Sequence, residues 1–270
     1  MEKVQTGIRG IAKVAVFLIL ALSYFSVAFF VHLTTLDPVV RRLRFTRNAS
    51  RFARLLCQLF NIKIWVKNKP PKNAKGLLVG NHMGFVDILA GIATMPSFFV
   101  TSQEIRETPF LGQITEMGGC LYVERRNRGN IMRELGEMVE YLSKGYRVVL
   151  YPEATSHNGE EILPFKRTLL SAAAHAGVPL RPFVFNFVSI NGEPFTKKWR
   201  DHVCYYGDIT FPVSIWRLLS LKEIICEIEY LEPLHPKIED DRRLVAERVR
   251  HMIVERFKPV QPDRTVGAFQ

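Results

Sequence analysis

The sequence has few cysteines, and they are not arranged as metal-binding or disulfide-forming cysteines usually are. The four are scattered along the chain with no CxxC pair: Cys57, Cys120, Cys204 and Cys226. Zinc sites built from thiolates need such pairs, and small disulfide-stabilised domains are richer in cysteine. The sequence therefore predicts free thiols in a reducing compartment and no metal site.

Internal repeats, low-complexity segments and the G-x-S-x-G sequence of serine hydrolases are also absent. Glycine (17) and proline (15) are not dominant in this chain of 270 residues, and 47% of the residues are hydrophobic. This length and composition suit one folded core with an anchor, and they argue against disorder and against two full enzyme domains.

Acidic residues are nearly missing from one long stretch. From Pro38 to Gln103 the chain has eleven Lys or Arg and a single acid, Asp87, so this stretch carries nearly all of the net charge of +11. Such an excess suits either nucleic acid or an anionic membrane. Because it directly follows an apolar run, we expect membrane lipids as the partner and no nucleic acid.

That apolar run, Val14–Leu36, is 23 residues long and contains no Lys, Arg, Asp or Glu. A helix of this length can span a bilayer core of ~30 Å, and it is too long for a cleavable signal peptide. A buried soluble helix and a helix that dips into one leaflet are the alternatives. The arginines that follow predict that the domain lies on the cytoplasmic face of the membrane.

The next segment has the pattern of a basic amphipathic helix. Its apolar residues recur at spacings of three and four, and its arginines lie largely on the opposite face: Phe45, Ala49, Phe52, Leu56 and Leu59 against Arg44, Arg47, Arg51 and Arg54. Such a helix lies in a headgroup layer or packs on the domain. We expect an anchor unit over residues 1–60 and a catalytic domain over residues 61–270.

Short β-rich runs alternate with helical patterns after residue 61. The expected strands are Ile62–Val66, Leu77–Val79, Phe98–Val100, Cys120–Val123, Arg147–Tyr151, Phe183–Val188 and Ile224–Tyr230. The expected helices are Val86–Thr94, Gly129–Ser143, Phe165–Ala176 and Asp240–Phe257. This order predicts an α/β fold with a mixed, mainly parallel sheet flanked by helices.

The segment Asn81–Asp87 (NHMGFVD) follows the second expected strand and contains a candidate base. On one continuous helix His82 and Asp87 would lie ~140° apart around the axis. They meet if His82 lies in a turn, which Gly84 permits, and Asp87 falls in the first turn of the next helix. Asp87 then orients the imidazole, and the other ring nitrogen is free to take a proton from a hydroxyl. A structural hydrogen bond or a metal ligand is the alternative for an isolated pair.

Two further segments place polar residues at strand ends, where α/β proteins bind ligands. Arg125 follows one strand, and an arginine there can hold a phosphate or carboxylate. Glu153 and Thr155 lie in Tyr151–Gly159, directly after another strand. Solvated or structural loops are the alternatives for both segments.

Taken in order, these segments resemble the motifs of the glycerolipid acyltransferase family. Asn81, His82 and Asp87 match NHxxxxD, Gly119 and Arg125 match the phosphate-binding block, and Pro152, Glu153 and Thr155 match F-P-E-G-T-R. Val178, Pro179 and Pro182 match VPVxPV, and Leu163–Lys166 also has the family pattern. Together the matches run from Leu77 to Val188.

The resemblance implies acyl transfer from a thioester, acyl-CoA or acyl carrier protein, to the hydroxyl of a lysolipid acceptor, with no cofactor. It implies His82 and Asp87 as catalytic residues and Arg125, Glu153 and Thr155 as substrate-binding residues. We expect backbone N–H groups after His82 to hold the oxyanion, and 1-acylglycerol-3-phosphate to be the acceptor.

The chain departs from the third motif, with Ala154 for glycine and Ser156 for arginine. Loss of that arginine makes lyso-ornithine lipid or another acceptor without phosphate an alternative, although Lys166, Arg167, Arg126 or Arg128 would compensate. A serine-type lipid hydrolase and a non-catalytic membrane-binding protein are the alternatives from other classes.

Overall fold

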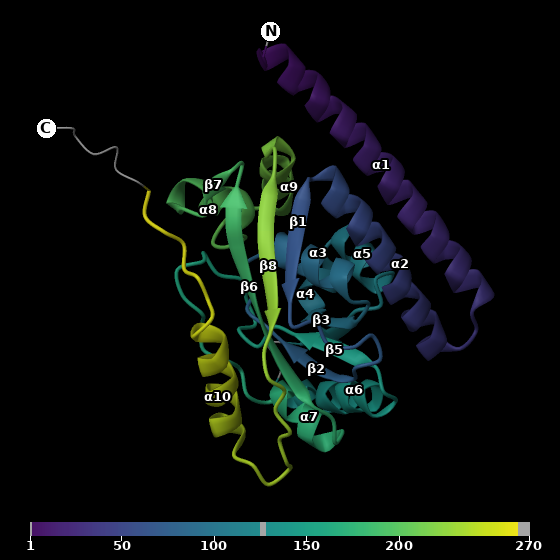
Figure 1. Ribbon diagram of the computed structural model, residues 1–270. Helices are drawn as coiled ribbons and strands as arrows, with labels where there is room; N and C mark the ends of the chain where they lie inside the picture. Colours follow the sequence, from purple (N-terminus) through teal and green to yellow (C-terminus); the bar gives the residue numbers. More distant parts are fainter. Residues whose placement is uncertain (1, 125–127, 264–270) are drawn as a thin grey trace, which may run out of the picture.

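The computed structural model, which describes residues 2–124 and 128–263, has a twisted sheet with helices on both faces (Figure 1). The order of the strands is β1-β8-β6-β2-β5-β3-β4, and the short β7 pairs with β6. The strands are β1 (Ile62–Lys67), β2 (Gly76–Val79), β3 (Phe98–Ser102), β4 (Leu121–Val123), β5 (Arg147–Leu150), β6 (Leu180–Ile190), β7 (Glu193–Pro194) and β8 (Ile224–Tyr230).

Most neighbouring strands in this sheet are parallel. β6, β2, β5, β3 and β4 form a parallel series, whereas β8 runs antiparallel to β6 and β1 runs parallel to β8. Parallel neighbours need crossover connections, which is why helical patterns separate the strand patterns in the sequence. The predicted mixed, mainly parallel α/β class is confirmed.

Two sets of helices cover the two faces of the sheet. One hydrophobic core joins α2 (Pro38–Leu59) and α3 (Phe85–Thr94) to the sheet, and the other joins α6 (Ile131–Ser143), α7 (Ala172–His175) and α10 (Arg242–Val254) to it. Short helices complete the fold: α4 (Gln103–Glu107), α5 (Leu111–Glu116), α8 (Lys197–Val203), α9 (Phe211–Ser220) and the 3₁₀ turns Arg128–Asn130 and Leu169–Ser171.

Helix α1 (Glu2–Thr34) contains one segment, Lys13–Thr34, that is long and apolar enough to cross a membrane. Tyr24 and Ala28 on one side of it are buried against the protein, while Leu18, Ile19 and Leu22 on the other side are more than 60% exposed. This helix is therefore a candidate membrane element that is also attached along one side to the domain.

Helix α2 begins at a cap formed by Asp37, whose carboxylate accepts hydrogen bonds from Val39 N and Val40 N. Its apolar stripe faces the protein, since Phe45 and Leu56 are buried and α2 packs between α1 and α3. The apolar stripe of α2 is therefore not available to lipid headgroups. Of the two alternatives for this helix, the stripe packs on the domain. The arginines on the other side, including Arg47 and Arg51, are exposed.

One predicted helix is much shorter in the structure. Phe165–Ala176 was expected to be helical throughout, but only Leu169–Ser171 and Ala172–His175 are. The preceding residues are held by the third motif: Lys166 N donates to Pro152 O (2.8 Å), and Leu163 N donates to the Glu153 carboxylate (2.7 Å). These tertiary hydrogen bonds hold the segment before Leu169 in a non-helical conformation.

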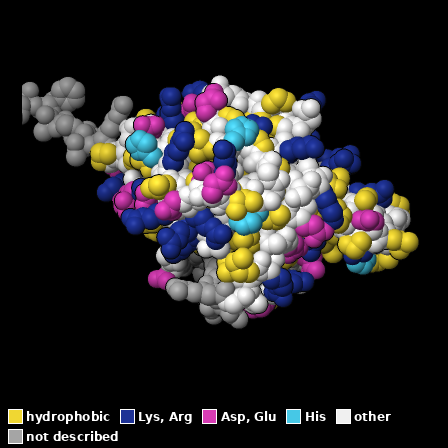
Figure 2. Space-filling view, turned by 90° about the horizontal axis from the view of Figure 1, so that it is seen from below, with side chains coloured by type: hydrophobic (Ala, Val, Ile, Leu, Met, Phe, Trp, Pro, Cys, Tyr) yellow, Lys and Arg dark blue, Asp and Glu magenta, His cyan; other side chains and the backbone are white. Residues whose placement is uncertain are grey.

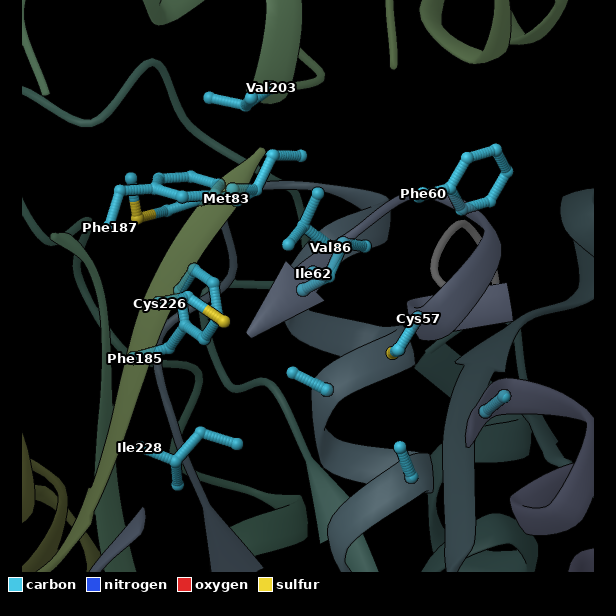
Figure 3. Close-up of a cluster of buried hydrophobic side chains, with 14 of the residues drawn as sticks. Cys57, Phe60, Ile62, Met83, Val86, Phe185, Phe187, Val203, Cys226 and Ile228 are labelled. Atoms are coloured by element: carbon cyan, nitrogen blue, oxygen red, sulfur yellow. The ribbon is translucent and has the colours of Figure 1, made fainter. Parts of the chain in front are cut away.

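Buried side chains anchor the segment after β2 in the core. Met83 and Val86 are fully buried and lie beside Phe185 and Phe187 of β6 (Figure 3). Asn81 extends the pairing of β2 with β6, since its side chain both donates to Phe185 O (3.0 Å) and accepts from Phe185 N (2.8 Å). Hydrogen bonds thereby hold Asn81 in place before His82, and burial holds Met83 and Val86 in place after it.

Candidate active site

His82 and Asp87 meet across the turn between β2 and α3. His82 Nδ1 lies 3.0 Å from Asp87 Oδ1, and Asp87 is at the third position of α3. Gly84 caps this helix with φ of 153°, and a side chain at this position would collide with the backbone N of Tyr205. The glycine is therefore required by both conformation and space.

The Asp87 carboxylate is held by the backbone of the turn as well as by the ring. Its Oδ2 accepts from Met83 N (2.6 Å) and Gly84 N (2.7 Å), and the side chain is only 1% exposed. These two N–H groups are therefore engaged, so the expected oxyanion donors at the helix start can only be N–H groups from Phe85 onward.

The second ring nitrogen of His82 remains available. Because Nδ1 faces a carboxylate, the neutral ring carries its proton there, and Nε2 has a free lone pair. Nε2 has no hydrogen-bond partner among the described residues, and the side chain is 19% exposed. The ring stacks on Tyr151 at 4.6 Å between centroids, which fixes its plane. Burial, followed by the charge of Asp87, raises the pKa of Tyr151 well above its ordinary value.

Glu153 lies at the end of β5 and is completely buried. Its Oε1 accepts from His82 N (2.8 Å), and its Oε2 accepts from Leu163 N (2.7 Å). Burial raises the pKa of Glu153 to about 7, although the two N–H donors act in the opposite direction. In this arrangement the carboxylate holds the backbone of His82 and has no exposed surface.

His157 forms the other half of a clamp on His82. His157 N donates to His82 O (3.0 Å), so the backbone of His82 is bound on both sides by the third motif. His157 Nδ1 accepts from Gly159 N (3.0 Å), which places the proton of the neutral ring on Nε2, 3.6 Å from Glu153 Oε2. Burial lowers the pKa of His157 to about 4. Local sequence gives no signal for this role of His157, because its partner is 75 positions away.

The two remaining hydroxyls of the third motif differ in their surroundings. Thr155 is exposed, at the surface of the same segment. Ser156 donates to Tyr205 O, and Tyr205 N donates to Met83 O (2.8 Å). The serine therefore links the segment after α8 to the catalytic turn, at the position where the family motif has arginine.

A pocket of about 940 Å³ opens beside Tyr151 and Ala154. Its inner wall is apolar, with Leu150, Phe165 and Leu169 among its residues, and exposed Lys166 and Arg167 also line it. An apolar wall beside cations suits a ligand with an acyl chain and an anionic end. The face of the molecule seen in Figure 2 carries further Lys and Arg side chains, mixed with acidic ones.

The predicted site residues thus have three different placements. The structure brings His82, Asp87 and Glu153 together and leaves Thr155 at the surface. Arg125 lies outside the described residues, as does Arg126. Within the described parts of the chain, no group of three or more His, Cys, Asp or Glu residues has the arrangement of a metal site, and the four cysteines are free thiols.

Comparison with known proteins agrees with the motifs. The family model described as Acyltransferase matches residues 61–186. A 1-acyl-sn-glycerol-3-phosphate acyltransferase of Neisseria gonorrhoeae is 27% identical over 194 residues, which are 72% of this chain and 74% of that protein. A lyso-ornithine lipid O-acyltransferase of Brucella abortus (strain 2308) is 28% identical over 210 residues, 75% of this chain and 78% of that protein.

The fold also has a counterpart among crystal structures. The 1-acyl-sn-glycerophosphate acyltransferase of Thermotoga maritima superposes with a TM-score of 0.67, covering 95% of this chain and 96% of that one. At 16% sequence identity this likeness concerns the fold. It includes the N-terminal helices, since nearly the whole chain is covered.

Proposed function

We propose that this chain, whose residues 61–186 match the Acyltransferase family model, is a membrane-associated enzyme of that family that transfers a fatty acyl chain from a thioester to the hydroxyl of a lysolipid. The observation that carries this proposal is the His82–Asp87 pair, in which one ring nitrogen is held at 3.0 Å and the other is free. A hydrolytic serine elbow is missing from the sequence, and the His82 side chain is 19% exposed, as a base that must reach its substrate requires.

In the proposed reaction His82 Nε2 takes the proton of the acceptor hydroxyl as its oxygen attacks the thioester carbonyl. Asp87 keeps the proton on Nδ1 and stabilises the imidazolium that forms. When the tetrahedral intermediate collapses, the C–S bond breaks, the new C–O ester bond remains, and the imidazolium returns its proton to the leaving thiolate. No cofactor enters this scheme.

The third motif has a positioning role in this proposal. Glu153 and His157 bind the backbone N–H and C=O of His82, so they set where the base lies rather than contacting the acceptor. Thr155 and Arg125 are kept as acceptor-binding residues. The pocket beside Tyr151 would receive the lipid, with Lys166 and Arg167 at its anionic end.

1-Acylglycerol-3-phosphate is the proposed acceptor, by analogy with the Neisseria relative. One observation favours a second candidate, a lyso-ornithine lipid: Ser156 replaces the motif arginine and is bound to Tyr205 O, so it supplies no cation. The relatives that acylate lyso-ornithine lipid have similar identity and coverage. Acyl-CoA and acyl carrier protein both remain proposed donors.

The proposed location is the cytoplasmic face of the membrane. The apolar outer side of α1 would enter the bilayer, and the exposed arginines of α2 would contact anionic lipid headgroups. Because the apolar stripe of α2 is buried in the protein, only the arginine side of this helix would contact the membrane.

The decisive experiment compares His82→Ala with the matched control His251→Ala on purified protein. His251 is an exposed histidine of α10 that pairs with Glu255. We expect acyl transfer from a labelled thioester to be abolished in His82→Ala and unchanged in His251→Ala, with both variants retaining the wild-type melting temperature to within a few degrees. Full activity of folded His82→Ala would disprove the mechanism.

The acceptor is tested with a panel that includes lysophosphatidic acid and lyso-ornithine lipid. If phosphate is recognised, Lys166→Ala and Arg167→Ala should raise KM for lysophosphatidic acid with little change in kcat. Lys144→Ala, on the surface of α6 and paired with Glu140, is the matched control. Preference for lyso-ornithine lipid, with no effect of the two substitutions, would favour the second candidate.

A further inference from the structure

Helix α9 exposes an uncharged face that includes a large aromatic residue. Pro212, Val213, Trp216 and Ser220 are all exposed, and their spacing puts them on one side of the helix. Trp216 is 69% exposed, whereas Ser214 and Leu218 on the opposite side are buried. A tryptophan on the outside of a helix with no charged neighbour on that face lacks a partner within the described chain.

Helix α9 lies against α1, the candidate membrane helix. α9 packs against α1, and Lys13 Nζ of α1 donates to Leu221 O, directly after α9 (3.3 Å). Figure 1 shows α9 at the end of the sheet nearest the N-terminal half of α1. Leu18 and Ile19, at the middle of α1, are 61% and 66% exposed. Two helices that are packed together therefore each carry exposed apolar side chains.

The composition of the α9 face suits the boundary between lipid headgroups and acyl chains. Tryptophan is enriched at this boundary because its ring is apolar while its N–H still finds a polar partner. A face of proline, valine, tryptophan and serine has no charge to desolvate there. Lys222, exposed just beyond the helix, can reach the headgroups.

We propose that α9 is a second membrane-contact element, whose Val213–Trp216 face inserts at the headgroup boundary of the bilayer that α1 enters. This inference rests on the membrane association proposed above and adds a specific surface to it. Lipid is the occupant because α9 packs on the helix that would enter the bilayer and its exposed face is uncharged.

Aromatic contacts join α9 to the catalytic turn. The Phe85 ring, at the first position of α3, packs on Phe211 of α9 and on Tyr205, with centroids 4.9 and 4.8 Å apart. Tyr205 N also bonds to Met83 O. Insertion of α9 would therefore hold His82 at a fixed depth relative to the membrane surface from which a lysolipid must come.

The test uses the fluorescence of single-tryptophan variants of the full chain bound to phosphatidylethanolamine–phosphatidylglycerol vesicles. The chain has three tryptophans. Replacing Trp65 and Trp199 by Phe leaves Trp216, and replacing Trp199 and Trp216 leaves Trp65 as the control, which is itself 50% exposed on β1. With brominated acyl chains in the vesicles, Trp216 emission should shift to shorter wavelength and lose intensity, while Trp65 emission should not.

Failure of the chain to float with vesicles would overturn both the membrane association and this inference. Flotation without quenching of Trp216, or with equal quenching of Trp65, would overturn this inference alone. A second measurement needs no fluorescence: Trp216→Ser should lower kcat/KM for lysolipid in vesicles and leave activity on a detergent-dispersed, short-chain lysolipid unchanged. Equal activity of Trp216→Ser and wild type on vesicles would contradict the inference.

Discussion

Two pairs of histidine and carboxylate lie side by side in this site, and they are not equivalent. In the pair after β2, Asp87 binds the ring of His82 at 3.0 Å. In the pair after β5, Glu153 lies 3.6 Å from the ring of His157, and both residues bind the backbone of His82 instead. Residue types alone would make each pair a candidate for the base.

Burial distinguishes them. The His82 side chain is 19% exposed and has a free nitrogen, whereas the His157 side chain is 3% exposed and its Nδ1 is occupied by Gly159 N. A base must reach its substrate, so only the first pair is suited to proton transfer. The second pair, in which burial disfavours both charged forms, is suited to holding the first in place.

The largest effect is expected from removing the orienting charge of the first pair. In Asp87→Asn the amide oxygen would accept from Met83 N and Gly84 N, so its NH₂ would face the ring and force the proton of His82 onto Nε2. The base would then have the wrong tautomer, and kcat should fall on the order of 10³-fold or more. Steady-state kinetics check this, with circular dichroism to confirm folding. Activity within tenfold of wild type would mean that Asp87 does not set the tautomer.

The second pair should reveal itself in the pH dependence of stability. The pKa of Glu153 is raised from 4.5 to about 7, so the folded state binds extra protons between these values and stability falls as pH rises. The pKa of His157 is lowered from 6.5 to about 4, so the folded state binds fewer protons there and stability falls as pH drops. The two slopes, each at most about 1.4 kcal/mol per pH unit, oppose each other.

Single substitutions should separate these slopes. In Glu153→Gln only the His157 slope remains, so the free energy of unfolding should rise from pH 4 to 6.5. In His157→Gln only the Glu153 slope remains, so the free energy of unfolding should fall from pH 4.5 to 7. The wild type should change less than either over this range. Urea denaturation at several pH values in one detergent measures all three, and three parallel curves would refute the opposite pKa shifts of the two buried groups.

The smallest effect concerns the residue that replaces the motif glycine. Ala154 has φ of 62°, a conformation that costs an alanine roughly 1 kcal/mol. Ala154→Gly should remove this strain, but glycine also gives the unfolded chain more conformational entropy, which lowers stability. The net rise in the free energy of unfolding should therefore be less than about 1 kcal/mol. Ala176→Gly is the matched control because Ala176 has an ordinary φ of −89°, so there the melting temperature should fall. A fall in both variants would show that position 154 is unstrained.

Much of the fold and of the site could be predicted from the sequence, but not all of it. The spacing of His82 and Asp87, with Gly84 between them, predicted a turn in which the two side chains meet, and they do. The strand patterns predicted the seven long strands to within a few residues. Helix α9 and the short helix α8 were not predicted, because they are only ten and seven residues long and their partners lie elsewhere in the chain.

Glu153 shows what local sequence patterns cannot predict. Its position at a strand end predicted a place in the site, yet nothing nearby in sequence indicates that its two oxygens bind the backbone of residues 82 and 163. The segment before the shortened helix is likewise held by distant residues, since Lys166 N donates to Pro152 O and Leu163 N donates to the Glu153 carboxylate.

By itself, then, the sequence determined the α/β class, the resemblance to acyltransferases and the candidate base, because periodicity, motifs and the contacts across one turn depend on residues close together in the chain. Only the tertiary structure decided which histidine is accessible, which carboxylate binds a ring and which binds backbone, and that the apolar stripe of α2 faces protein. Those features depend on β2 and β5 being neighbours in the sheet, which brings residues about 70 positions apart within hydrogen-bond distance.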